Sequence, residues 1–302
     1  MRHFETRYQK CPICYSGIKL WRKKMGDDGQ DYTIDVCTQC EYGFVNPRPT
    51  MDFLMNYYAK LGTSNNVSES NSISLAMILK NEQEYPNSTI DAKRMIDTIN
   101  KIMDSHGKKS LLDIGCGYGF FTQAALKTGF TVTALELSDH GKKITKELTG
   151  IEPVSSSFET FSCASSFDVI MMSQILEHAL DIHLWIEKAY QYLTAGGVLA
   201  IALPNFSSAF RKIMQEREPF ICPPEHLNFF SLKNLTQLLQ QYGFVVEKMN
   251  WQSRLPMQTV QKYLPGYVKA FTKVIYPITK TGLKTLDLMK LGSVLNIYAR
   301  KQ

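Results

Sequence analysis

The chain has 302 residues, of which 44% are hydrophobic and 21% charged, and its formal net charge is +6. This composition is typical of a globular protein of about two domains and excludes a disordered chain. No stretch approaches the roughly 18 uninterrupted apolar residues of a membrane span. The N-terminus carries no signal-peptide pattern, so we expect a cytoplasmic protein.

Four of the seven cysteines form two CxxC pairs near the N-terminus. Cys11 and Cys14 are separated by 22 residues from Cys37 and Cys40, a spacing typical of a zinc ribbon. Four thiolates leave no open position on the metal, so we expect a structural Zn²⁺ in a ribbon over residues 1–50. Because this segment lacks clustered basic residues among exposed aromatic ones, we expect no nucleic-acid partner.

Residues 51–108 are predicted to be a helical linker or cap. A helix begins near residue 51, and the polar segment 62–72 then suits a connection between elements. Two helical stretches, 74–85 and 91–105, lead into the next domain.

The segment KSLLDIGCGYGFFTQAALKTGFTVTALELS, residues 109–138, predicts a strand, a tight turn, a helix and a second strand, which is one unit of an open parallel sheet. The turn contains three glycines, Gly115, Gly117 and Gly119. Such a turn serves dinucleotides and S-adenosylmethionine alike. Asp113 beside it would oppose a pyrophosphate but favour the cationic amino group of S-adenosylmethionine. Glu136 is placed to accept ribose hydroxyls, which either cofactor allows.

The motifs LLDIGCGYG, LEL, FDVIMMSQILEHALD and LTAGGVLAIALPN, in this order, resemble the class I S-adenosylmethionine-dependent methyltransferases. The resemblance implies an α/β fold with a Rossmann-like, seven-stranded sheet whose last strand is antiparallel, preceded by the small zinc ribbon. The S-adenosylmethionine-binding core would span residues 109–252. The resemblance also implies that Asp113 and the three glycines line the methionine part of the cofactor, that Glu136 binds the ribose, and that Leu137 contacts the adenine. Ser157 and Phe158 stand where many members place an acidic residue for the adenine amino group.

The stretch SQILEHA follows a strand predicted over residues 167–172, which puts Ser173 and Gln174 beside the cofactor. It looks like the corresponding stretch of quinone-biosynthesis O-methyltransferases, in which two glutamates and a histidine are linked to a divalent cation. Gln174 stands where the first glutamate would be, which argues against metal-assisted catechol chemistry. His178 is then either functional or a structural histidine at a helix start.

After a strand over residues 198–203, residues 206–231 leave the sheet at the usual place for substrate-facing structure. They contain the sequence PPEHLNFFS, in which Glu225 could orient or charge His226. We expect His226 to be a general base or a substrate contact, with plain packing as the alternative. We do not expect a metal ion at His226, because the four thiols complete a metal site elsewhere.

The C-terminal segment is basic, with ten Lys or Arg and one acid from Lys248 onward. We predict a helical insertion over residues 253–292 and a last core strand over 293–302. The insertion carries lysines at helical spacing: Lys269, Lys273, Lys280 and Lys284. Its basic face, within 265–290, would contact an anionic or lipid-linked acceptor or a membrane surface; the alternatives are a solvated face or a homodimer contact.

The ribbon, the NPRP exit, the core and the EHLNFFS loop are together similar to a bacterial group of methyltransferases. Its members act on nucleotide-linked sugars and on surface-polysaccharide or secondary-metabolite precursors. The large C-terminal domain of its sugar C-methyltransferases is missing here, which favours O-methylation of a sugar-like, nucleotide-linked or lipid-linked acceptor. The alternatives are a quinone-type O-methyltransferase, or a non-catalytic, nucleic-acid-associated zinc protein with a degenerate methyltransferase domain.

Overall fold

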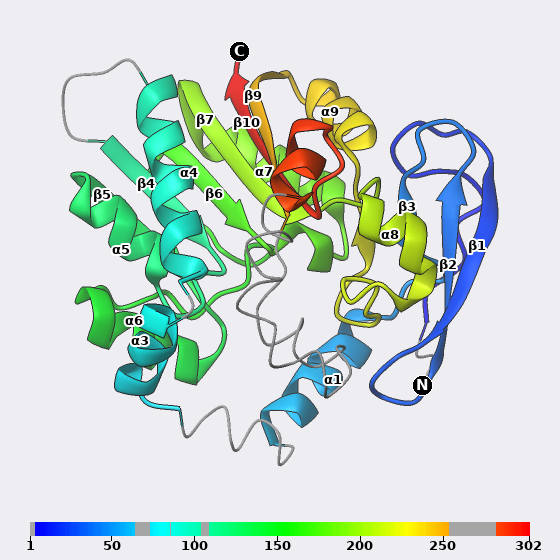
Figure 1. Cartoon of the computed structure of the whole chain (residues 1–302), viewed down its shortest axis with the longest axis horizontal. Helices are drawn as coiled ribbons and strands as arrows, with labels where there is room; N and C mark the ends of the chain where they lie inside the picture. The colour runs from blue at the N-terminus through cyan, green and yellow to red at the C-terminus, as the bar shows by residue number, and fades with distance from the viewer. Residues whose placement is uncertain (1–3, 64–72, 85, 104–108, 254–281) are drawn as a thin grey trace.

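The structure, a computed structural model, describes residues 4–63, 73–84, 86–103, 109–253 and 282–302 (Figure 1). Residues 282–288 are helical. Most of the predicted basic face lies outside the described residues, including Lys269, Lys273 and Lys280. None of the described helices is long and apolar enough to cross a membrane.

The core is one mixed sheet whose strand order is β5-β4-β6-β7-β10-β9. Strands β5, β4, β6 and β7 are parallel, and β10 runs antiparallel to both of its neighbours. Their bounds are Lys109–Ile114 (β4), Phe130–Leu135 (β5), Phe167–Ser173 (β6), Leu193–Pro204 (β7), Phe244–Gln252 (β9) and Val294–Lys301 (β10). The expected α/β sheet with its antiparallel last strand is confirmed.

This sheet has six strands where we expected seven. The missing one, third in chain order, is reduced to a single parallel bridge between Leu135 and Val154. Pro153 precedes Val154 and the serines 155–157 follow it, so no apolar or β-branched run is available to extend the pairing.

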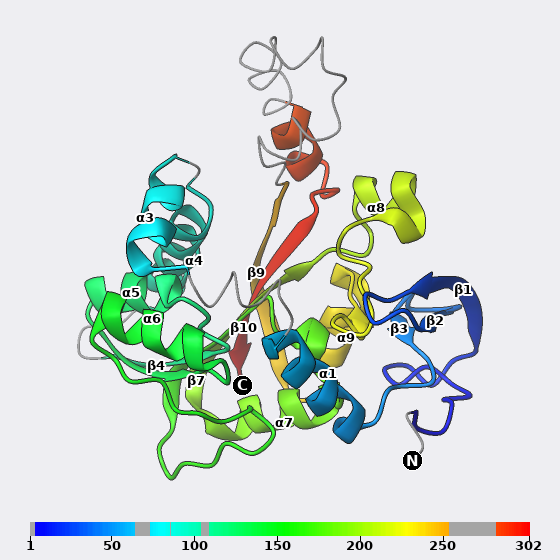
Figure 2. The ribbon, with the colours of Figure 1, turned by 90° about the horizontal axis from the view of Figure 1, so that it is seen from below.

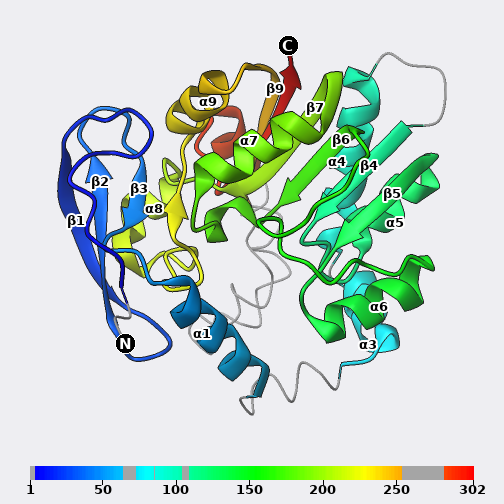
Figure 3. The same cartoon turned by 180° about the vertical axis from the view of Figure 1, so that it is seen from behind.

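Helices cover both faces of the sheet (Figures 1 and 3). Side chains alternate along each strand, so Leu111 packs with α4 and α5 while Leu112 packs with α7 and α9. These helices are α4 (Ser88–Ile102), α5 (Phe120–Lys127), α7 (Ile182–Tyr192) and α9 (Leu232–Gln241). Helices α3 (Leu75–Glu84) and α6 (Asp139–Thr149) share a smaller apolar cluster with α4 and α5.

The N-terminal ribbon is a small antiparallel sheet beside the core, next to α8 (Ala209–Met214) and α9 (Figure 2). Its strands are β1 (Ile18–Met25), β2 (Asp31–Cys37) and β3 (Gly43–Val45). A fourth strand, β8 (Asn228–Phe229), comes from the segment that follows β7 and pairs with β3. The ribbon also contacts α9, where the Gln241 side-chain amide donates to the carbonyl of Ile13 at 2.7 Å. The predicted ribbon and the predicted substrate loop therefore share one sheet.

Candidate functional site

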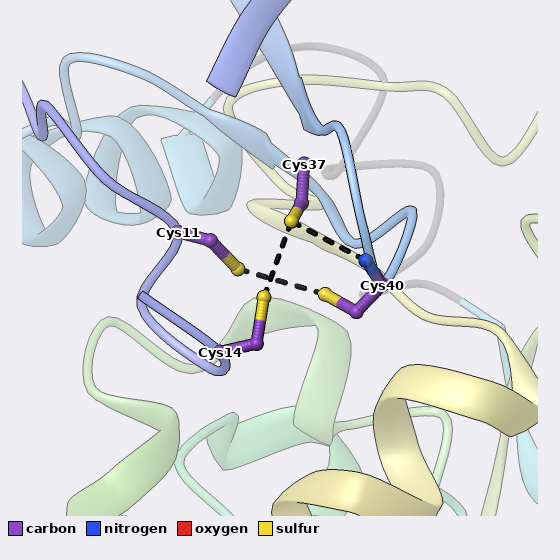
Figure 4. A group of neighbouring side chains, drawn as sticks. All are labelled: Cys11, Cys14, Cys37 and Cys40. Carbon is purple, nitrogen blue, oxygen red and sulfur yellow. Dashed lines mark hydrogen bonds between the residues drawn. The ribbon is translucent and has the colours of Figure 1, made fainter. Parts of the chain in front are cut away.

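The four cysteines of the ribbon point toward one another (Figure 4). Their sulfurs lie within 4.8 Å of one another, with 3.6 Å between Cys11 and Cys40 and 3.3 Å between Cys14 and Cys37. Four sulfurs around one Zn²⁺ at about 2.3 Å would be separated by about 3.8 Å, so the cage has nearly the required size. The distances also exclude disulfides, whose sulfurs are about 2.05 Å apart.

The surroundings of these thiols lower the pKa of Cys11 and of Cys14, whereas burial raises the pKa of Cys37. The pKa of Cys11 is lowered to about 5, chiefly by its hydrogen bond with Cys40, whose own pKa is raised because the pair shares a proton. The backbone N–H groups of Gln39 and Cys40 both donate to the sulfur of Cys37 at 3.4 Å. Donors aimed at a sulfur stabilise its negative charge, as zinc coordination requires.

The glycine turn between β4 and α5 is bonded to the end of β5. The N–H of Gly117 donates to one carboxylate oxygen of Glu136 at 2.9 Å, and the N–H of Ser138 donates to the other at 2.7 Å. All three glycines have positive φ, and a Cβ on Gly115 would lie 2.9 Å from the Ile175 side chain. At Gly117 a Cβ would meet nothing within 4 Å, so this part of the turn is open to a ligand.

Asp113 lies beneath the turn rather than on its surface. It is 1% exposed, and Thr122 Oγ1 donates to its carboxylate at 2.6 Å. The pKa of Asp113 is raised to about 7, chiefly by burial, with a smaller contribution from the charge of Glu136 and against the opposing Thr122 hydrogen bond. The side chain therefore holds the start of α5 to β4, and its charge acts on the ligand region from below.

On the adenine side, the predicted residues differ in exposure. Leu137 is 57% exposed and can contact a ligand, and Ser157 is half-buried. Phe158 is 1% exposed and packs edge-on against Trp185 in the core. Only the backbone of Phe158 can therefore take part in adenine binding.

The carboxyl end of β6 lies against the glycine turn. Ser173 and Gln174 are half-buried there, and the N–H of Gln174 donates to the carbonyl of Ala202 in β7 at 2.7 Å. Gln174 has φ +56°, so the chain turns sharply and sends Ile175 toward Gly115. The glutamate and histidine that follow are thereby close to the predicted cofactor region.

Glu177, His178 and His226 meet at this end of the sheet. One ligand atom from each lies within 4.8 Å of the others, and the two imidazole rings are perpendicular with centroids 4.7 Å apart. Burial and the neighbouring His226 lower the pKa of His178 to about 3, burial lowers that of His226, and burial raises that of Glu177 to about 8. The four thiols were our ground for expecting no metal ion at His226, but they lie in the ribbon, and Glu177, His178 and His226 form a separate group of possible ligands to which that ground does not apply.

Glu225, next to His226, lies close enough to helix α1 (Met51–Thr63) for its charge to act on that helix. It is half-buried, and burial followed by the charge of Asp27 raises its pKa. Its own charge in turn contributes to the raised pKa values of Tyr57 and Tyr58, after the larger effect of burial. The loop and α1 therefore bring two phenols and a carboxylate near one another.

The side chain of Asn228 connects the ribbon to this cluster. It accepts hydrogen bonds from Tyr42 Oη at 2.5 Å and from Arg48 at 2.6 Å, and it donates to the carbonyl of Ala179 at 2.7 Å. The carbonyls of Leu176 and Glu177 lie at 3.3 and 3.2 Å from the same amide nitrogen. Since all these groups are buried, the ribbon fixes the backbone that carries Glu177 and His178.

The family described as Methyltransferase domain matches residues 88–249, which is more than half of the chain. The chain belongs to this family. The expected enzyme class, a methyltransferase that uses S-adenosylmethionine, is confirmed at the level of the family and its fold. The structure of an S-adenosylmethionine-dependent methyltransferase from Archaeoglobus fulgidus superposes on this chain with a TM-score of 0.51 at 20% identity. The match covers 74% of this chain and 99% of that one.

Curated relatives of this methyltransferase carry the name ubiquinone biosynthesis O-methyltransferase. The protein from Caulobacter sp. (strain K31) is 30% identical over 103 residues, which are 32% of this chain and 40% of that protein. The protein from Pelagibacter ubique is 30% identical over 180 residues, 53% of this chain and 74% of that protein. The match to the Caulobacter relative thus spans about two fifths of its length.

Sequence analysis of this methyltransferase missed Asn228 and the third member of the cluster, Glu177. The signal that could have found Glu177 is its position directly before His178, in the stretch that follows β6. No local signal pointed to Asn228, because its partners come from the ribbon and from the segment after β6, both distant in sequence.

Proposed function

We propose that the chain transfers a methyl group from S-adenosylmethionine to a hydroxyl oxygen of a sugar-like, nucleotide-linked or lipid-linked acceptor. The observation that carries this proposal is the position of two histidines, His178 and His226, whose ring centroids lie 4.7 Å apart close to Ile175, the residue that packs on Gly115 of the glycine turn. A neutral imidazole can accept a proton, as O-methylation of an alcohol requires. The O-methyltransferase names of the curated relatives also support an oxygen acceptor.

The residues at the carboxyl ends of β4 and β5 fit the cofactor. Gly117 leaves open space in the turn. The carboxylate oxygens of Glu136 now accept hydrogen bonds from backbone N–H groups, and ribose hydroxyls could replace these donors. Leu137 offers an exposed apolar surface to the adenine. Bound there, S-adenosylmethionine supplies an electrophilic methyl group.

The acceptor would lie between the turn and the loop that carries Glu225 and His226. The acceptor oxygen bonds to the methyl carbon while the sulfur–methyl bond breaks, which yields S-adenosylhomocysteine. The hydroxyl proton passes to the pair formed by His226 and Glu225.

We also propose that Cys11, Cys14, Cys37 and Cys40 hold a structural Zn²⁺. The cage size and the N–H groups aimed at Cys37 support it. Through β3, β8 and Asn228, the ion would stabilise the backbone of the acceptor region.

The test is a methyl-transfer screen against nucleotide sugars, polyprenyl-phosphate sugars and catechols, with wild type and His226→Ala. The proposal predicts product from a sugar-bearing acceptor and a loss of about 100-fold or more in His226→Ala, with binding of S-adenosylmethionine retained. Equal turnover by both proteins would exclude His226 as a participant. Methylation of catechols alone would instead favour the second candidate, a quinone-type O-methyltransferase, to which the names of the curated relatives point.

A further inference from the structure

We propose that Lys188, in α7, is a positioning residue for the adenosine part of S-adenosylmethionine and acts through the turn at residues 158–161. Its ammonium group donates to three backbone carbonyls of this turn: those of Phe158 at 2.7 Å, Glu159 at 2.8 Å and Phe161 at 2.8 Å. The role rests on the proposed placement of the cofactor at the glycine turn, and it is independent of the acceptor.

The segment that leads into this turn passes beside the predicted cofactor region. It begins at the single bridge between Leu135 and Val154, where the N–H of Glu136 also donates to the carbonyl of Val154 at 3.1 Å. The carboxylate of the same Glu136 accepts a hydrogen bond from Gly117 of the glycine turn at 2.9 Å. The segment is therefore tied to the residue expected to bind the ribose.

Side chains of α7 hold the turn where a regular third strand would have been held by backbone pairing. Besides Lys188, Trp185 donates from Nε1 to the carboxylate of Glu159 at 2.7 Å, and Tyr192 donates from its hydroxyl to the carbonyl of Phe161 at 3.1 Å. Positions 185, 188 and 192 are three and four residues apart, so their side chains lie on one face of the helix. The turn is thus attached to the core by side chains that come from one helix.

The positive charge of Lys188 allows three carbonyls to converge on one point. Carbonyl oxygens that are brought together repel one another unless a cation or several donors lie between them. An ammonium group supplies three N–H donors, and hydrogen bonds from a charged donor are stronger than those between neutral groups. The same ammonium lies 5.4 and 5.8 Å from the ring centroids of Phe158 and Tyr192. Removal of the charge would therefore leave the backbone of the turn without its main attachment.

The position of the turn affects the ligand through its backbone. The side chain of Phe158 is 1% exposed and packs against Trp185, so it leaves only backbone atoms to face an adenine base. An adenine that contacts the exposed Leu137 would meet this backbone beside Ser157. A turn that is ordered before the ligand binds lowers the entropic cost of binding. Lys188 would thereby raise the affinity for the cofactor without contacting it.

The test is calorimetric binding of S-adenosylhomocysteine and of 5′-methylthioadenosine to the full chain and to Lys188→Met. Methionine keeps an unbranched side chain and removes the charge. We expect the dissociation constants of both ligands to rise about tenfold, because both contain the adenosine part.

The matched control is Lys301→Met. Lys301 also donates to two backbone carbonyls, those of Tyr190 at 2.6 Å and Leu193 at 2.8 Å, but it does so at the C-terminal end of α7. Its loss should lower the free energy of unfolding in urea and leave both dissociation constants unchanged.

Unchanged dissociation constants in Lys188→Met, or an equal rise in Lys301→Met, would overturn the inference. A rise for S-adenosylhomocysteine alone would also overturn it, since the effect would then lie outside the adenosine part. If Lys188→Met does not fold, Glu159→Ala takes its place: it removes a half-buried side chain and its bond to Trp185, and it should raise both constants about threefold. Unchanged constants in that variant would count against the inference.

Glu136→Gln separates this inference from the proposed placement of the cofactor. Weaker binding in Glu136→Gln with no change in Lys188→Met would overturn the role of Lys188 and leave the placement intact. No change in either variant would count against both.

Discussion

The substitution Asp113→Asn should change how the stability of the ligand-free protein depends on pH. The folded-state pKa of Asp113 is about 7, against 3.8 in the unfolded chain, because the carboxyl group is buried. A raised pKa means that the folded state binds the proton more tightly, so this contribution is complete below about pH 4 and is lost as pH rises through 7. At about 1.4 kcal/mol per unit, the loss is about 4 kcal/mol.

Asparagine removes the titration but retains an oxygen that can accept the hydrogen bond from Thr122. The difference in unfolding free energy, variant minus wild type, should therefore rise by about 4 kcal/mol between pH 4 and pH 8, whatever its value at pH 4. Urea unfolding at a series of pH values measures it, with Asp97→Asn on the surface of α4 as the control. Parallel stability curves for wild type and Asp113→Asn would refute the inferred burial of this charge.

Three further changes test other parts of the site. Glu136→Gln removes the charge expected to bind the ribose and should weaken S-adenosylmethionine binding about tenfold by calorimetry; unchanged affinity would count against this role. Cys37→Ser should release Zn²⁺ and lower the melting temperature by about 10 °C, and a metal content equal to that of wild type would contradict the cage. Asn228→Ala removes a buried side chain that has hydrogen-bond partners in the ribbon and after β6, so the unfolding free energy should fall by about 3 kcal/mol in denaturant titrations. A change within experimental error would mean that this connection contributes little to stability.

Much of the core could be predicted because its signals are local. The apolar run before the glycine turn forms β4, and the helix predicted after it is α5. At the start of α9, Ser231 forms a capping box with Asn234, which is a short-range signal of a helix start. The two CxxC pairs could be combined into one site because a hairpin between them brings its two ends together.

The remaining features depend on contacts that no local pattern encodes. β8 is two residues long and exists because β3 offers an unpaired edge. Gln174 takes a left-handed conformation that directs Ile175 to the glycine turn, which composition alone does not predict. The meeting of His226 with Glu177 and His178 requires the loop after β7 to fold back onto β6, so the sequence named both histidines without joining them in one site.

The most direct test of the central claim, that acceptor chemistry takes place where the glycine turn meets the histidine cluster, is a crystal structure with S-adenosylhomocysteine. We predict ribose hydroxyls bonded to Glu136 and a sulfur atom that faces His178 and His226. A ligand bound in another part of the molecule, or a sulfur directed away from this cluster, would contradict the account.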